Sequence, residues 1–159
     1  MKNLIILLVT SVTLMFIACG GSETSSDQTS STPSEKPAAP EADQGKGIGE
    51  IKNVTLNTPL KAGMVEKGKS IYEMKCAACH KNTEQRVVGP GFAKVTERRK
   101  PEWIMNMVTN VEVMLDEDPV ARELLKQCLV KMPNQNLSIG DARDVLEYLY
   151  ANDGYEVGE

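Results

Sequence analysis

The sequence is poor in histidine and in aromatic residues. His80 is the single histidine among 159 residues, and aromatic side chains make up 4% of the chain. A domain of about a hundred residues would therefore be short of bulky side chains for its core. After Phe16 the aromatic residues are Tyr72, Phe92, Trp103, Tyr148, Tyr150 and Tyr155.

A surplus of basic charge is also missing. One of the 18 basic residues, Lys2, lies within the first 19 positions, which leaves 17 basic residues against 22 acidic ones beyond Cys19. Proteins that bind nucleic acid need a concentrated basic surface. The charge balance therefore argues against a nucleic-acid partner. The length suits one domain with appendages.

The one long apolar run, residues 4–17, has 14 residues and follows a basic start. It is too short to span a bilayer comfortably and is typical of a signal peptide. It ends at Phe16-Ile17-Ala18-Cys19, which resembles a bacterial lipobox. We therefore expect a lipoprotein signal peptide over residues 1–18 and lipidation of Cys19. This places the protein in the cell envelope, anchored to a bacterial membrane and facing the periplasm. The alternative is an ordinary signal peptide cleaved near Ala18.

Residues 19–58 are predicted to form a lipidated flexible linker. The segment is rich in Ser and Thr up to Thr32, then in Pro, Ala and Glu, and then in Gly. It has no apolar periodicity from which a core could form. Ile51, Val54 and Leu56 can begin the ordered part as an extended lead-in to a domain over residues 59–159.

That domain is predicted to be all-α. The spacing of its apolar residues predicts helices over residues 64–76, from Pro101 to Val111, from Pro119 to Leu129, and after Ser138. Ser138 and Asp141 have the spacing of a capping box. Residues 89–91 and Pro133 break the helical pattern, and the run Arg98-Arg99-Lys100 is interpreted as the polar approach to a helix. No alternating strand pattern of useful length is present.

The motif Cys76-Ala77-Ala78-Cys79-His80 has the Cys-x-x-Cys-His pattern of covalent c-type haem attachment. Two thiols can add to the two vinyl groups of one porphyrin, and the next residue can supply an imidazole nitrogen to the iron. On a helical turn Cys76, Cys79 and His80 face the same way. A buried porphyrin would also supply the bulk that the core lacks.

Two other interpretations of the motif remain open. One is a structural zinc site made from Cys76, Cys79, His80 and Cys128. The other is a thioredoxin-like Cys-x-x-Cys site, which needs a strand–helix–strand setting. If Cys128 has no such role, the default is a buried free thiol on an apolar helix face.

A six-coordinate iron needs a second ligand, and no other histidine exists. Thioether sulfur is the natural alternative, and Met/His ligation raises the reduction potential. Met132 precedes Pro133 in a non-helical break, from which a loop can aim its side chain across a haem. Met114 ends the preceding helical segment and is the competitor, and an open or different sixth site is the third possibility. Beyond the signal peptide the methionines are Met64, Met74, Met105, Met107, Met114 and Met132.

Over residues 62–151 the chain resembles class I c-type cytochromes, and specifically bacterial, membrane-tethered, monohaem lipoproteins of that family. The resemblance implies one covalent haem c whose iron is bound by His80 and Met132, with the Pro90 carbonyl accepting a hydrogen bond from the other His80 nitrogen. It also implies that the first helix crosses the last near Leu146, Tyr148 or Leu149. The segment from about Glu112 to Lys131 is longer than in the smallest members. The resemblance is carried by Gly68-x-x-x-Tyr72, the Cys76–His80 motif, Gly89-Pro90, Met132-Pro133 and Tyr148-Leu149.

The function implied is one-electron transfer, without enzymatic activity and without a small-molecule substrate. Tethered relatives carry electrons in respiratory chains from a quinol-oxidising complex to a terminal oxidase or reductase, including nitrogen-oxide reductases. Basic residues near the haem edge could steer an acidic partner, or could be ordinary solvated charges. The alternative function is a haem protein with an open sixth site, acting as a small-ligand sensor or a peroxidase-like enzyme. The basic residues in question are Lys75, Lys81, Arg86 and Lys131.

Overall fold

The computed structural model of the protein describes residues 45–159. The predicted signal peptide over residues 1–18, the lipidation site Cys19 and the linker up to residue 44 lie outside the described residues. Between residues 45 and 159 the regular elements are all helices, accompanied by two isolated β-bridges. The predicted all-α fold is confirmed. No described helix is long and apolar enough to cross a membrane. The helices are α1 (Ala62–Lys75), α2 (Val95–Arg98), α3 (Pro101–Thr109), α4 (Val111–Glu117), α5 (Pro119–Lys126) and α6 (Ile139–Asn152).

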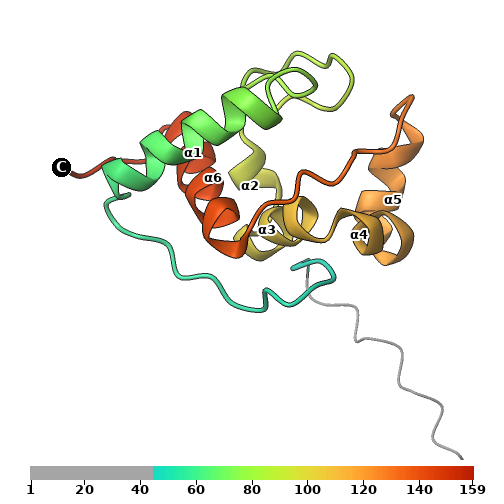
Figure 1. The fold of residues 1–159 in the computed structure, drawn as a ribbon, viewed down its shortest axis with the longest axis horizontal. Helices are drawn as coiled ribbons and strands as arrows, with labels where there is room; N and C mark the ends of the chain where they lie inside the picture. The colour runs from blue at the N-terminus through green and yellow to red at the C-terminus, as the bar shows by residue number, and fades with distance from the viewer. Residues whose placement is uncertain (1–44) are drawn as a thin grey trace, which may run out of the picture. The chain divides into compact units, whose positions relative to one another are not determined.

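The crossing of α1 and α6 organises the domain (Figure 1). At Gly68 the backbone of α1 lies so close to α6 that an added Cβ would collide with the carbonyl group of Asp144. One turn later, the ring of Tyr72 packs against the ring of Tyr148, with 5.1 Å between their centroids. Glycine in a helix is destabilising by itself, so Gly68 is explained by this close approach. The helix crossing expected from the resemblance is confirmed.

Local sequence signals explain where the later helices begin. Ser138 and Asp141 form the predicted capping box of α6, whose apolar face supplies buried Val145, Leu146 and Leu149. Asp118 caps α5 by accepting a hydrogen bond from the Ala121 amide at 2.7 Å.

The helical segment after Pro101 differs from the prediction. The sequence pattern predicts one helix as far as Val111, whereas the structure has α3 and α4 separated at Asn110. Asn110 has a non-helical backbone, and its side-chain amide donates to the carbonyl oxygen of Ile48 at 3.2 Å. A side chain that bonds to backbone elsewhere competes with helix continuation, and apolar periodicity carries no information about such a contact.

The predicted linker over residues 19–58 extends too far into the chain. Residues 45–58 pack on the domain, and Ile51 is buried in its core. The buried Asn106 side chain accepts from the Ile51 amide at 3.2 Å and donates to the Ile51 carbonyl at 2.9 Å, and so pairs with this backbone as a neighbouring strand would. Farther along, the Asn57 side chain donates to buried Glu147 at 2.8 Å. Val54 and Leu56 also pack against the core, so the expectation that Ile51, Val54 and Leu56 begin the ordered part is confirmed.

The helix crossing predicts the effect of exchanging Gly68 for alanine. Because the new methyl group would meet the α6 backbone, we expect Gly68→Ala to destabilise the domain by about 1–3 kcal/mol. Gly63→Ala on the same helix is the matched control, because a Cβ there has open space. It should stabilise the domain by roughly 0.5–1 kcal/mol. Denaturant unfolding followed by circular dichroism measures both, and equal effects would contradict a tight crossing at Gly68.

Candidate functional site

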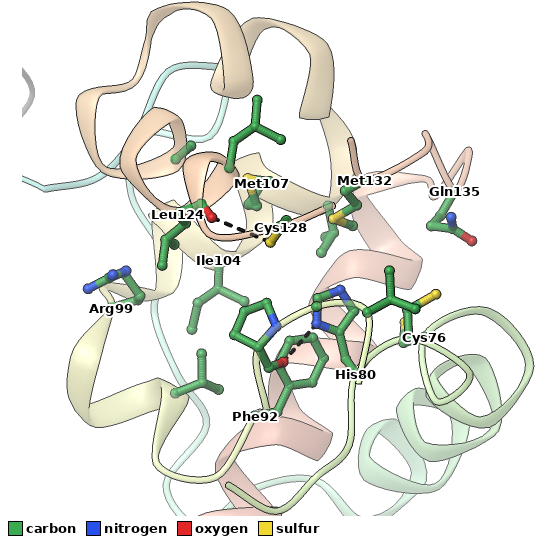
Figure 2. Close-up of a pocket in the computed structure, with 18 of the residues that line it drawn as sticks. Cys76, His80, Phe92, Arg99, Ile104, Met107, Leu124, Cys128, Met132 and Gln135 are labelled. Carbon is green, nitrogen blue, oxygen red and sulfur yellow. Dashed lines mark hydrogen bonds between the residues drawn. The ribbon is translucent and has the colours of Figure 1, made fainter. Parts of the chain in front are cut away.

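A deep apolar cavity lies between the Cys76–His80 turn, α3, α5 and the segment that leads from α5 to α6 (Figure 2). Its space, with the open mouth included, measures about 1350 Å³. Residues from all parts of the helical domain, such as Trp103, Ile104, Leu124 and Leu149, form its walls. The cavity is therefore suited to a large, flat, mostly apolar group.

The end of α1 delivers both motif cysteines and His80 to this cavity. The amides of Cys79 and His80 donate to the Cys76 carbonyl at 3.0 and 2.8 Å, so the chain makes one further tight turn after α1. The predicted shared face is present, because all three residues line the cavity. Neither cysteine forms a disulfide. Burial raises the pKa of the Cys76 thiol to about 11, as expected for a side chain that faces an apolar space.

The His80 ring is held in one orientation. Its Nδ1 lies 2.9 Å from the carbonyl oxygen of Pro90 (Figure 2). A carbonyl oxygen only accepts, so Nδ1 carries the proton and Nε2 keeps a free lone pair. Burial lowers the pKa of His80, and the bond to Pro90 opposes that shift. A neutral imidazole with a free Nε2 is the form that binds metals. The contact between His80 and Pro90 implied by the resemblance is thus present.

Three further residues shape the position of His80. The sequence singles out Tyr72 for the helix crossing and Gly89 for the Gly89-Pro90 break, but it predicts no contact with His80 for these two or for Phe92. Phe92 stacks on the imidazole with 4.6 Å between ring centroids and 13° between planes. Gly89 lies so close that an added Cβ would collide with the ring. The Tyr72 hydroxyl donates to the His80 carbonyl at 2.8 Å. The sequence feature that could have indicated the roles of Gly89 and Phe92 is their position beside Pro90, in the loop of residues 89–92 that returns to the Cys76–His80 motif.

Two methionines among the described residues line the cavity, Met107 from α3 and Met132 from the segment before α6. Figure 2 shows Met132 on the wall across from His80, with its side chain turned into the cavity. Met114, the predicted competitor, does not line the cavity. It is fully buried, and its sulfur accepts a hydrogen bond from the Ile48 amide at 3.0 Å. The geometry therefore favours Met132 over Met114.

Cys128 lines the same cavity but does not complete a zinc site. Its thiol is half-buried and lies 3.4 Å from the Leu124 carbonyl. Within residues 45–159 no group of three or more His, Cys, Asp or Glu side chains is arranged to hold a metal ion. That same part of the chain also lacks the strand–helix–strand setting of a thioredoxin-like site.

Two arginines, Arg98 and Arg99, contribute to the wall of the cavity, and Figure 2 shows Arg99 across the cavity from Cys76. The Arg99 guanidinium lies 5.2 Å from the ring centre of Trp103, and burial and the neighbouring Arg98 lower its pKa. Haem carries its vinyl groups on one half of the porphyrin and two carboxylates on the other. Thiols on one side of an apolar cavity and the Arg99 guanidinium across from them match that pattern.

An all-helical domain with this cavity, two thiols and an oriented imidazole defines a protein that carries covalently bound haem c. The chain belongs to the cytochrome c family, whose model matches residues 65–152. It is 34% identical to cytochrome c from Rhodothermus marinus, with a TM-score of 0.65 over 70% of this chain and 93% of that one. An engineered cytochrome c from the same organism, Rma TDE, is 31% identical, with a TM-score of 0.66 over 71% of this chain and 98% of that one. Among curated proteins no relative matches the chain.

The contact at Gly89 leads to a second prediction. Gly89→Ala would place a methyl group against the His80 ring, so either the ring or the loop must move. We expect a loss of about 1–3 kcal/mol in unfolding free energy, together with altered NMR shifts of the His80 ring protons. Gly140→Ala is the control, since a Cβ there makes only an ordinary contact. Unchanged His80 shifts in the Gly89 variant would show that the ring does not depend on this contact.

Proposed function

We propose that the protein is a one-electron carrier whose haem is attached through Cys76 and Cys79 and ligated by His80 and Met132. The observation that carries the proposal is the placement of His80 and Met132 on facing walls of one apolar cavity. When bound there, the haem supplies an iron that exchanges one electron between its ferrous and ferric forms. Arg98 and Arg99 are positioned to hold its carboxylates.

The protein residues contribute rigidity and exclusion of water. Pro90 and Phe92 fix the ring of His80, so this ligand keeps its direction in both oxidation states. A hydrogen bond to the outer nitrogen also increases the basicity of a ligating histidine. If Met132 also held the iron, no position would be left for a substrate, as a carrier requires. A thioether ligand would favour a high reduction potential.

The mouth of the cavity offers a surface for a redox partner with an acidic face. Apolar side chains of two loops line the cavity and stay exposed, with Val88 exposed by 39% and Val130 by 57%. Exposed apolar side chains that lie together are typical of an interaction site. Lys75 and Lys131 also line the cavity and would steer an acidic partner. Of the other two cations, Arg86 bonds to Gln127 in the segment before Met132, and Lys81 donates to the Ala77 carbonyl at 3.0 Å.

The cellular setting proposed is the outer face of a bacterial membrane. Residues 1–18 resemble a lipoprotein signal peptide, and a lipidated Cys19 would anchor the protein on the periplasmic side. The polar stretch that follows would let the domain reach both a quinol-oxidising donor and a terminal oxidase or reductase, including a nitrogen-oxide reductase.

A haem protein with an open sixth site is the second candidate function. A further solved structure supports it, namely engineered Rma TDE bound to a carbene intermediate, 31% identical to this chain with a TM-score of 0.63. If Met132 does not bind the iron in this chain, a small ligand could take that place. A sensor or a peroxidase-like enzyme would then be the outcome.

Met132→Ala separates the two functions. We expect the haem-loaded variant to lose the sulfur-to-iron band at the red end of the ferric spectrum, and its reduction potential to fall. Met107→Leu is the control, because Met107 also lines the cavity. It should keep both the band and the potential. The measurement is a redox titration followed by absorbance.

Two results would count against the carrier proposal. A Met132→Ala protein with the parent spectrum and potential would show that the sulfur is not a ligand. Rapid binding of carbon monoxide by the native ferrous protein would indicate an open sixth site.

The charged rim leads to a separate prediction about rate. Lys131→Gln should slow oxidation of the ferrous protein by anionic ferricyanide by a factor of about two at low salt, because Lys131 lines the cavity. The difference should shrink as the Debye length falls from about 30 Å at 0.01 M to about 8 Å at 0.15 M. Lys69→Gln is the control, since Lys69 pairs with Glu73 on α1 and does not line the cavity. If Lys69→Gln slowed the oxidation by the same factor, the effect would come from the net charge of the protein and not from the position of the lysine.

A further inference from the structure

The segment that carries Met132 has no regular structure of its own. Residues 127–136, between α5 and α6, belong to no helix or strand. Their backbone therefore lacks the repeating hydrogen bonds that hold a helix in place. Side chains from the motif side of the domain bond to this backbone at two points, one before and one after Met132.

The first such contact comes from Lys75, the last residue of α1. Its ammonium group donates to the main-chain carbonyl of Gln135 at 3.1 Å. Lys75 directly precedes Cys76, and Gln135 lies three residues after Met132. The contact therefore joins the haem-attachment motif to the far side of the ligand segment.

The second contact comes from Arg86, which is linked to the histidine by an isolated antiparallel bridge between His80 and Arg86. Its guanidinium donates to the main-chain carbonyl and to the side-chain oxygen of Gln127, both at 3.3 Å. It also lies 3.7 Å from the Cys128 sulfur. Gln127 precedes Met132 by five residues, so this contact joins the histidine loop to the near side of the same segment.

We propose that Lys75 and Arg86 are positioning residues that hold the ligand segment closed from both sides of Met132. The proposal rests on Met132 being the sixth ligand, as proposed above. Both cations donate to main-chain carbonyls, so they fix the path of the backbone itself. On its other side the segment is joined to α4, where Asn134 donates to Glu112 at 3.2 Å and Lys131 pairs with Asp116 at 3.7 Å. Lys75 and Arg86 are what connect it directly to the histidine side of the cavity.

The proposal has a measurable consequence for exchange of the sixth ligand. An added ligand binds only when the segment has opened, so its apparent affinity is proportional to the fraction of open molecules. Loss of one hydrogen bond changes such an equilibrium by a factor of about two to ten. Removal of either cation should therefore tighten binding of added imidazole by about that factor, and removal of both should tighten it further.

The experiment uses the full chain with its haem attached, in the ferric state and at fixed pH. Imidazole titrations compare the parent with Lys75→Met and Arg86→Met, which keep the apolar stems and remove the donors. Lys69→Met removes a cation from the exposed face of α1 and is the matched control. Lys75→Arg and Arg86→Lys restore a donor and should bring back part of the parent affinity. Thermal unfolding of each variant is measured alongside.

The expected result is tighter imidazole binding in both Met variants, with Lys69→Met equal to the parent. Imidazole affinities that do not change, or that change only in proportion to the unfolding temperature, would overturn the proposal. If a Met variant does not fold, Lys75→Gln or Arg86→Gln, whose shorter uncharged side chain cannot replace the cation, takes its place in the same titration. Imidazole affinity equal to the parent's in both would then overturn the proposal. Failure of Met132 as a ligand is recognised separately, because Met132→Ala would then leave the spectrum unchanged.

Discussion

The close contact between α1 and α6 is the constraint on which the rest of the domain depends. Gly68 allows the two backbones to touch, and the ring of Tyr72 is then placed against Tyr148. The same Tyr72 donates through its hydroxyl to the His80 carbonyl. The residue that fixes the helix crossing thus also fixes the turn after the cysteines. A shift of α1 along α6 would move Cys76, Cys79 and His80 together relative to the remaining walls of the cavity.

The two axial sides of the cavity are built in different ways. On the histidine side, Pro90, Phe92 and Gly89 surround the ring with a hydrogen bond, a stacked ring and a close backbone contact. On the side of Met132, the segment between α5 and α6 has no helix or strand, and side chains of Lys75, Arg86 and α4 bond to it. The imidazole cannot turn without disturbing its loop. If Met132 is a ligand as proposed, ligand exchange is therefore expected on its side of the cavity.

The all-α class, the haem motif, the helix crossing at Gly68, the loop at Gly89-Pro90 and Met132 could be predicted from the sequence. Each of them is marked by a pattern of residues that are close together in the chain. Cys-x-x-Cys-His is a complete chemical unit, and Met132-Pro133 stands in a recognisable break. The break at Asn110 and the polar contacts that hold the lead-in could not be predicted, because both depend on side chains bonding to distant backbone. Asn106 contacts Ile51 across 55 positions of sequence. Polar contacts over such a distance in sequence produce no periodic pattern of apolar residues. The role of Phe92 was equally hidden, since an aromatic residue after a Gly-Pro-Gly turn could pack almost anywhere.

Cations at the cavity mouth can serve two purposes without conflict. An ammonium group has three N–H donors and a guanidinium group has five. Lys75 uses one donor on Gln135, and Arg86 uses two of its nitrogens on Gln127. Both side chains remain exposed, so the remaining donors can face an acidic partner while the inner ones hold the ligand segment. Partner docking would weaken the hold on the Met132 segment only if a partner carboxylate displaced Gln135 from Lys75 or Gln127 from Arg86. In that case partner binding would also alter ligand exchange at Met132, whereas charge steering alone would change only the rate of encounter.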